Sequence, residues 1–446
     1  MSGYFPERGL NGKMPAGGPE ALERGLNADA SGDRLAALGR LLELERSGAI
    51  SAPAASGFVN NHIHTVYSFS PYSPSKAVWR SRAAGLSVSG IVDHDSVAGV
   101  REYREAGLLL GFPTTAGFEL RSDHTATPLG GRRTNNPDQE GVSYMTFHGL
   151  RDSALEAVGE FLKPVAEARG ERNRAMCAKL AEISGLPLDY ESDVLPLSRR
   201  HEGGSVTERH LLCALSLAAI HEYGGHVFEF LKRRLSFGDG SIEKLTASWG
   251  ESVYNLENNK AGVAGDGRMA ADGAQMGDAG FGGACPYGGD FFLYDLIGAM
   301  KASLVGSFYI PAGAAECPPL KTLVKFASAH DIIITYPYLG DVTNSVTGDK
   351  KAQSFEDGFL DELFGVLDGM GIRAVSYMPA RNTREQAVRV RELADRYGML
   401  QISGEDINSP RQPFISEASK DPYFANLRET TWKLVEHERG EINLLE

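Results

Sequence analysis

Short apolar runs and helix-like stretches alternate along much of the chain. A short run rich in branched and aromatic residues, bounded by polar ones, is typical of a buried strand. Between the runs, apolar residues recur at helical spacing, as over 76–84 and 97–106. The pattern predicts seven strands, at residues 58–64, 87–92, 114–118, 142–147, 332–335, 372–377 and 400–403.

Other helices are indicated by amphipathic spacing or by their first residues. Residues 36–44 form one amphipathic segment near the N-terminus, and Ser354 is a plausible cap for a helix over 354–367. Thr383-Arg384-Glu385-Gln386 is a capping box, in which the Thr and Gln side chains bond each other's backbone amides. We therefore expect a helix from Thr383 to about residue 397.

Strands that alternate with helices indicate a parallel sheet, here closed into a barrel. We predict an α/β fold, a distorted (β/α)7 barrel with a largely helical insertion over 152–310. Helical patterns over 171–183, 207–221 and 226–235 predict the helices of that insertion. The glycine-rich stretch 261–289 has too little apolar content to bury a core, so we expect a flexible loop.

This pattern divides the chain into four parts. We expect an N-terminal helical extension and linker at 1–55, and the first part of the barrel at 56–151. The insertion follows at 152–310, and the second part of the barrel with a C-terminal tail at 311–446.

Composition narrows the possible partners. The 446 residues carry a formal net charge of −13, so the chain gains little from phosphate attraction and we expect no nucleic-acid polymer as partner. Four cysteines without a Cys-x-x-Cys pair indicate neither a thiolate metal site nor a disulfide framework. The N-terminus lacks a signal-peptide pattern, and the apolar run near 211–220 is too short for a membrane span. We expect a cytoplasmic protein that does not enter a membrane; the sequence does not indicate an oligomeric state.

Imidazole and carboxylate side chains follow the predicted strands. His62 and His64 end the first strand, and alternation places both on one face. Catalytic groups of such barrels lie at the carboxyl ends of the strands, and this ligand type suits Mn²⁺, Fe²⁺ and Zn²⁺. A single histidine is more often an ordinary surface or core residue, but the repetition predicts a divalent metal site. Its candidate ligands are His62, His64, Glu119 and Asp406, with His94 and His148 after two further strands.

The same strand ends resemble motifs of the PHP (polymerase and histidinol phosphatase) family, whose members are distorted seven-stranded β/α barrels. Residues 60–68 (NNHIHTVYS) resemble Asp-x-His-x-His-Thr-x-x-Ser, with Asn60 in place of the leading Asp. Residues 92–95 (VDHD) resemble Thr-Asp-His-Asp, and Glu119 and His148 match two shorter motifs. The resemblance covers about 58–150 and 320–410.

The resemblance implies up to three metal sites, and departures from the motifs weaken two of them. The first site is complete in His62, His64, Glu119 and Asp406. The second keeps His148 but has Tyr336 where the family has histidine. The third keeps only His94, because Phe69 and Asn408 stand at its other positions. We expect one strong site, a weaker second site and no third.

The expected activity is metal-dependent hydrolysis of small phosphoesters such as nucleotides. His94, held by Asp93 or Asp95, is the candidate general acid or base. In the insertion, residues 172–174 (RNR) and 207–212 (TERHLL) resemble family elements that contribute to phosphate binding. Arginine suits that task because its planar fork binds two oxygens. The candidate phosphate-binding residues are Arg209, His210 and Arg411.

Ordinary structural roles and other functions stay open for these residues. Arg209 and His210 could simply cap and solvate a helix, and Arg411 could be an ordinary loop arginine. The lost ligands could instead mark a regulatory module that binds a metal or a phosphorylated metabolite without turnover. The same ligands could also serve hydrolysis of an amide or another C–N bond.

Overall fold

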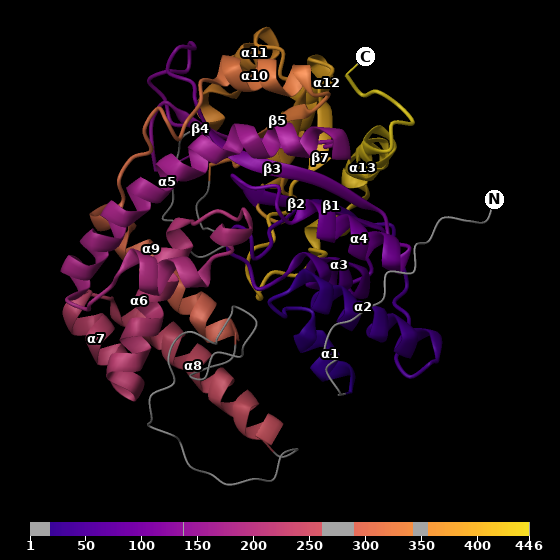
Figure 1. The fold of residues 1–446 in the computed structure, drawn as a ribbon. Helices are drawn as coiled ribbons and strands as arrows, with labels where there is room; N and C mark the ends of the chain where they lie inside the picture. Colours follow the sequence, from indigo (N-terminus) through magenta and orange to yellow (C-terminus); the bar gives the residue numbers. More distant parts are fainter. Residues whose placement is uncertain (1–17, 137, 261–289, 342–355, 446) are drawn as a thin grey trace.

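All seven predicted strands are present in one sheet, in chain order from β1 to β7 (Figure 1). The computed structural model describes residues 18–136, 138–260, 290–341 and 356–445, so the glycine-rich stretch 261–289 and Ser354 lie outside the described residues. The strands are β1 (Val59–Ile63), β2 (Val88–His94), β3 (Thr114–Asp123), β4 (Val142–His148), β5 (Ile333–Pro337), β6 (Ala374–Tyr377) and β7 (Leu400–Ser403).

The two edges of the sheet meet, which nearly closes it into a barrel. The His64 amide donates to the Ile407 carbonyl at 2.9 Å, and the Ile407 amide donates to the His62 carbonyl at 3.0 Å. These bonds join the end of β1 to the segment that follows β7. The expected α/β barrel with helical parts is therefore confirmed.

The direction of β4 differs from the prediction. β4 runs antiparallel to both β3 and β5, whereas the other neighbouring strands are parallel. Residues 124–141, which join β3 to β4, contain no helix in their described part, whereas the crossover that joins a parallel pair is usually helical. Because β3 continues to Asp123 along β4, Glu119 stands inside a strand and not at its end.

The helices around the sheet follow the predicted alternation. Thr383 caps α12 as expected, because its amide donates to Gln386 Oε1 at 2.8 Å and its hydroxyl accepts from the Gln386 amide at 3.2 Å. These helices are α3 (Pro74–Ala83), α4 (Val100–Leu110), α10 (Leu320–Ala329), α11 (Leu360–Gly369), α12 (Arg384–Arg396) and α13 (Ala425–Glu438). From residue 18 onward, two α-helices precede the sheet, α1 (Pro19–Gly25) and α2 (Ser31–Arg46).

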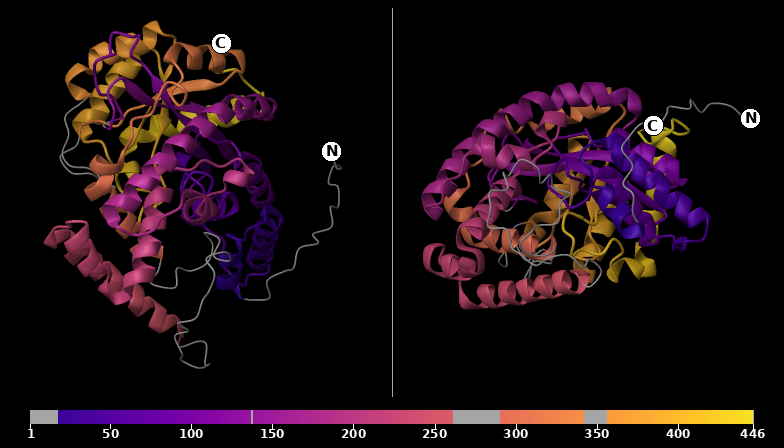
Figure 2. Two further views of the ribbon diagram at one scale, coloured as in Figure 1. Left: turned by 60° about the vertical axis from the view of Figure 1, so that its left-hand side comes forward. Right: turned by 60° about the horizontal axis from the view of Figure 1, so that its bottom comes forward.

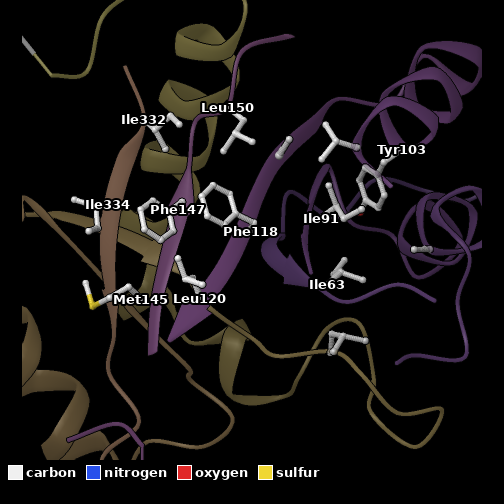
Figure 3. Packing of buried hydrophobic residues seen from close by; sticks show 14 of the residues in the cluster. Ile63, Ile91, Tyr103, Phe118, Leu120, Met145, Phe147, Leu150, Ile332 and Ile334 are labelled. Atoms are coloured by element: carbon white, nitrogen blue, oxygen red, sulfur yellow. The ribbon is translucent and has the colours of Figure 1, made fainter. Parts of the chain in front are cut away.

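The apolar core of the barrel joins the sheet to its covering helices. Phe118 of β3 and Phe147 of β4 stack with ring centroids 4.3 Å apart (Figure 3). Ile63, Ile91 and Tyr103 belong to the same buried cluster. Burying such residues supplies the main favourable term in the free energy of folding. Here it holds together strands that lie far apart in the sequence.

Among the described residues, five α-helices lie between β4 and α10 and gather to one side of the sheet (Figures 1 and 2). They are α5 (Leu155–Ser184), α6 (Glu208–Tyr223), α7 (Val227–Arg234), α8 (Asp239–Lys260) and α9 (Asp290–Phe308). Their buried residues form a second cluster, to which the barrel contributes Phe69 from the loop after β1. Since β4 is reversed, it ends away from the carboxyl edge of the sheet, and the long helix α5 leads the chain back toward that edge.

Helix α9 was not anticipated from the sequence. Residues 291–308 are long and apolar enough to cross a membrane, and a third of that stretch is buried in the protein. Core helices of soluble proteins have the same length and composition, and α9 packs against α5, α6 and α8. That the protein stays out of the membrane remains a prediction.

Candidate metal centre and substrate pocket

Four predicted ligands come together at the carboxyl edge of the barrel. The Nε2 atoms of His62 and His64 are 3.2 Å apart. Glu119 Oε2 lies 3.5 Å from His62 Nε2 and 3.8 Å from His64 Nε2. Asp406 Oδ1 lies 3.3 Å from His64 Nε2. Both histidines and Glu119 are buried, whereas the Asp406 side chain is 34% exposed.

These spacings fit a single metal ion. Ligand atoms about 2.1 Å from one ion are about 3.0 Å apart in octahedral and about 3.4 Å apart in tetrahedral coordination. The four distances, 3.2, 3.3, 3.5 and 3.8 Å, lie close to these values. Both His62 and His64 turn Nε2 toward the carboxylates. The ligand atoms of His62, His64 and Glu119 all lie within 4.8 Å of one another, so these three side chains could hold a divalent metal, and Asp406 adjoins them through His64.

Asp93 orients His64, and not His94 as predicted. Its carboxylate accepts from the Thr65 amide at 2.7 Å and from the hydroxyls of Thr65 and Ser68 at 2.6 and 2.5 Å. Ser68 Oγ also lies 3.1 Å from His64 Nδ1. Because the serine proton goes to Asp93, His64 donates from Nδ1, which leaves a lone pair on Nε2 for a metal.

His94 lies beside Glu119 at the wall of a pocket. Its Nδ1 is 3.4 Å from Glu119 Oε2, and its side chain is 27% exposed. Asp95, the other expected partner, forms a buried ion pair with Arg169 instead. Burial alone would raise the pKa of Glu119, but His94 and the two metal-site histidines lower it to about 2. Glu119 is therefore a carboxylate at neutral pH.

His148 is near the metal group, whereas Tyr336 is bound elsewhere. His148 pairs with Gly117 across the sheet, on the face that carries Glu119. Its buried Nε2 has no hydrogen-bond partner among the described residues, and burial, reinforced by the nearby His62, lowers its pKa to about 3. Tyr336 donates its hydroxyl to Glu356 at 2.5 Å and accepts the Asn135 amide at 3.1 Å. The Tyr336 hydroxyl is thus engaged by Glu356 and Asn135, and its predicted metal-binding role stays a prediction.

The metal group opens into a pocket of about 350 Å³ between the barrel and the helices. Barrel residues His62, His64, His94, Glu119 and Asp406 form one part of its wall. Lys301 and Val305 of α9, and Tyr309 directly after it, also line the pocket. The wall also includes several aromatic side chains, which are Phe69, Tyr144, Tyr309, Tyr338 and Tyr377.

Only Arg209 of the three predicted phosphate-binding residues lines this pocket. Its Nη1 donates to Asn408 Oδ1 at 2.5 Å, and Asn408 Nδ2 donates to Asp406 Oδ1 at 2.7 Å. No carboxylate in the described part of the chain lies within 4.0 Å of the Arg209 guanidinium. Arg209 is thus next to the metal group with its charge available.

His210 and Arg411 have structural roles, contrary to the prediction. His210 Nδ1 accepts the Thr207 amide at 2.9 Å and completes a capping box at the start of α6. Arg411 is bidentate on Asp295 of α9, with its Nε 2.8 Å from Oδ1 and its Nη2 2.6 Å from Oδ2. Neither side chain lines the pocket. The helix-capping and loop-arginine alternatives hold for these two residues.

Sequence reasoning missed a buried network of three arginines and three carboxylates beside the metal group. The Arg-x-x-Arg spacing falls at Arg169 and Arg172 of α5, so it begins three residues before the segment 172–174. Helical spacing could have identified this pair. The network consists of Arg121, Arg169, Arg172, Asp95, Glu208 and Glu316.

Comparison with known proteins supports the barrel fold. No family model matches the chain, and no curated protein matches it in sequence. A solved structure described as a "putative metal-dependent phosphoesterase" from Bifidobacterium adolescentis aligns with a TM-score of 0.52 at 18% identity, covering 89% of this chain and 99% of that one. An amidohydrolase from Chromobacterium violaceum, with bound sulfate and no metal, aligns with a TM-score of 0.48 at 13% identity, over 83% and 96% of the chains.

Proposed function

We propose that this protein is a metal-dependent hydrolase of small phosphoesters, of the PHP type that its motifs resemble. One observation carries the proposal. Ligand atoms of His62, His64 and Glu119 lie within 4.8 Å of one another, Asp406 lies against His64, and the pocket that they face also holds the Arg209 guanidinium. A cationic group and candidate metal ligands that line one pocket suit an anionic ester.

The side chains have distinct tasks in such a reaction. His62, His64, Glu119 and Asp406 would hold Mn²⁺, Fe²⁺ or Zn²⁺, and an ion held there would activate water and neutralise charge on a phosphoryl oxygen. Arg209 would bind the remaining phosphoryl oxygens through its planar fork. Nδ1 of His94 faces Glu119, so the other ring nitrogen of His94, Nε2, would take a proton from the attacking water or return one to the leaving oxygen.

The second metal site is the weaker part of the proposal. His148 offers an unpartnered nitrogen near Glu119, but Tyr336 does not complete the set. We propose one resident ion, with a second bound less tightly. The small phosphorylated substrate and the cytoplasmic location belong to the same proposal.

The test combines metal analysis with a substrate panel. Purified protein is loaded with Mn²⁺, Fe²⁺ or Zn²⁺, its metal content is counted, and phosphomonoesters, phosphodiesters and amides are offered. We expect hydrolysis of at least one phosphoester class. His64→Ala should lose the bound metal and at least 100-fold in kcat/KM, on the order expected for a lost ligand. The matched control is His201→Ala, which changes a 73% exposed histidine and should keep both.

Each contrary result points to a different function. Metal-loaded protein that binds phosphate without hydrolysing any ester would favour the regulatory module. Hydrolysis of amides alone would favour C–N bond cleavage by the same ligands. A protein that takes up no divalent metal would overturn the proposal.

A further inference from the structure

The carboxylate of Glu208 is held by three guanidinium groups beside the metal centre. Glu208 Oε1 accepts from Arg121 Nη2 at 2.8 Å and from Arg172 Nη2 at 2.9 Å, and Oε2 accepts from Arg169 Nη2 at 2.9 Å. Glu208 is also the first residue of α6, where the helix dipole favours a negative charge. The side chain therefore stands where an external oxyanion would be bound well.

The three arginines are buried and come from two elements of the fold. Arg121 belongs to β3, and Arg169 and Arg172 belong to α5; their side chains are 4%, 4% and 6% exposed. Buried Nε atoms of Arg121 and Arg169 have no hydrogen-bond partner within the described ranges. The arginines thus retain donors that their carboxylate partners do not use.

Glu208 differs from the other carboxylates of this network in facing the pocket. The pocket is lined by Glu208, Arg121 and Arg169, but not by Asp95 or Glu316. The Glu208 side chain is 14% exposed, compared with 4% for Asp95 and 3% for Glu316. Asp95 and Glu316 balance two of the three positive charges of the arginines. Glu208 balances the third, on the side of the network that faces the pocket.

We propose that Glu208 determines substrate specificity by filling a binding site for a second anionic group. Its carboxylate occupies the cradle of Arg121, Arg169 and Arg172, as a phosphate or sulfate would. A substrate with one phosphate can use the metal centre and Arg209. A substrate with a second phosphate on this side meets a carboxylate of the protein and is excluded by repulsion. The substrate part of the proposal rests on the proposed function, whereas the cradle itself does not.

The cradle can be tested without catalysis. Sulfate binding to metal-free protein is measured by calorimetry, and the midpoint of thermal unfolding is followed as sulfate is added. Glu208→Ala should bind sulfate at least tenfold more tightly than the unchanged protein, and its Tm should rise with sulfate concentration. Adding Arg169→Met to this variant should abolish the gain. Glu316→Gln, which changes a carboxylate of the same network away from the pocket, should not produce it.

The result that overturns the cradle is a folded Glu208→Ala protein that binds sulfate no better than the unchanged one. Should Glu208→Ala not fold, Glu208→Gln retains the shape of the side chain without its charge. We expect at least tenfold tighter sulfate binding there as well, and equal binding would overturn the proposal.

Substrate preference separates this inference from the proposed function. A sugar 1-phosphate and the matching sugar 1,6-bisphosphate are compared as kcat/KM ratios. The unchanged protein should prefer the monophosphate, and Glu208→Ala should shift the ratio at least tenfold toward the bisphosphate. Equal use of both by the unchanged protein would overturn the specificity role. Sulfate binding by Glu208→Ala without any phosphoester hydrolysis would refute the proposed function and leave the cradle intact.

Discussion

Nδ1 of His64 lies 3.1 Å from Oγ of Ser68, which links a metal-site histidine to a carboxylate on the neighbouring strand β2. Ser68 donates to Asp93, so the chain of bonds sets the tautomer of His64 and aims its Nε2 at Glu119 and Asp406. Such supporting bonds raise the affinity of a metal site and hold its geometry.

Removing the hydroxyl of Ser68 should therefore weaken metal binding without removing a ligand. We expect Ser68→Ala to lower metal affinity by about 10- to 100-fold, measured by competition with a chelating dye. Ser47→Ala changes an exposed serine at the end of α2 and should leave the affinity unchanged. Unchanged affinity in Ser68→Ala would show that the serine does not position His64.

Tyr336 should matter for stability and not for metal content. Its hydroxyl donates to the buried Glu356, and loss of one such bond costs about 1–3 kcal/mol when a partner is left unsatisfied. We expect Tyr336→Phe to lower the free energy of unfolding in urea by this amount, with the number of bound metal ions per chain unchanged. A drop in metal content would restore the ligand role that the sequence resemblance implied.

Glu356 should make stability fall as the pH rises. Burial raises its pKa from about 4.5 to about 7. Between these values the folded protein keeps a proton that the unfolded chain has released, so the free energy of unfolding decreases with increasing pH, by on the order of 3 kcal/mol across the window. Above the folded pKa this contribution is lost.

The variant Glu356→Gln isolates the contribution of Glu356 to the pH dependence of stability, because glutamine is neutral at every pH. We expect the unchanged protein to lose more stability than the variant between pH 5 and pH 8 in urea unfolding. Parallel pH dependence in the two proteins would contradict a raised pKa at this site.

Substitution of Arg209 should weaken phosphate binding and substitution of Arg411 should not, although the sequence made both candidates for this role. Arg209 lines the pocket, whereas Arg411 is 42% exposed and paired with Asp295. We expect Arg209→Ala to weaken inorganic phosphate binding by about 10- to 100-fold, the value of a charge-assisted bond. Arg411→Ala should leave phosphate binding unchanged and cost about 0–1 kcal/mol of stability. Equal effects of the two changes on phosphate binding would contradict this assignment.

Local sequence patterns determined most of the secondary structure and the core of the metal group. Each strand was recognisable because its apolar run is short and bounded by polar residues, and α12 because its capping box is complete within four residues. His62 and His64 could be placed on one face because strand alternation is a local property.

Only the tertiary structure decided how partners from distant segments combine. The direction of β4 depends on the loop that joins it to β3, which contains no helix in its described part. The pattern of apolar residues is the same for a parallel and an antiparallel strand, so it could not predict this direction. A charged side chain pairs with an opposite charge that is close in space, whatever its distance along the chain. Asp95 therefore pairs with Arg169, and Arg411 pairs with Asp295. The sequence by itself therefore identified the residues of the candidate metal group. Burial and charge pairing across α5, α6 and β3 decided which arginines remain available and placed Glu208 among three of them.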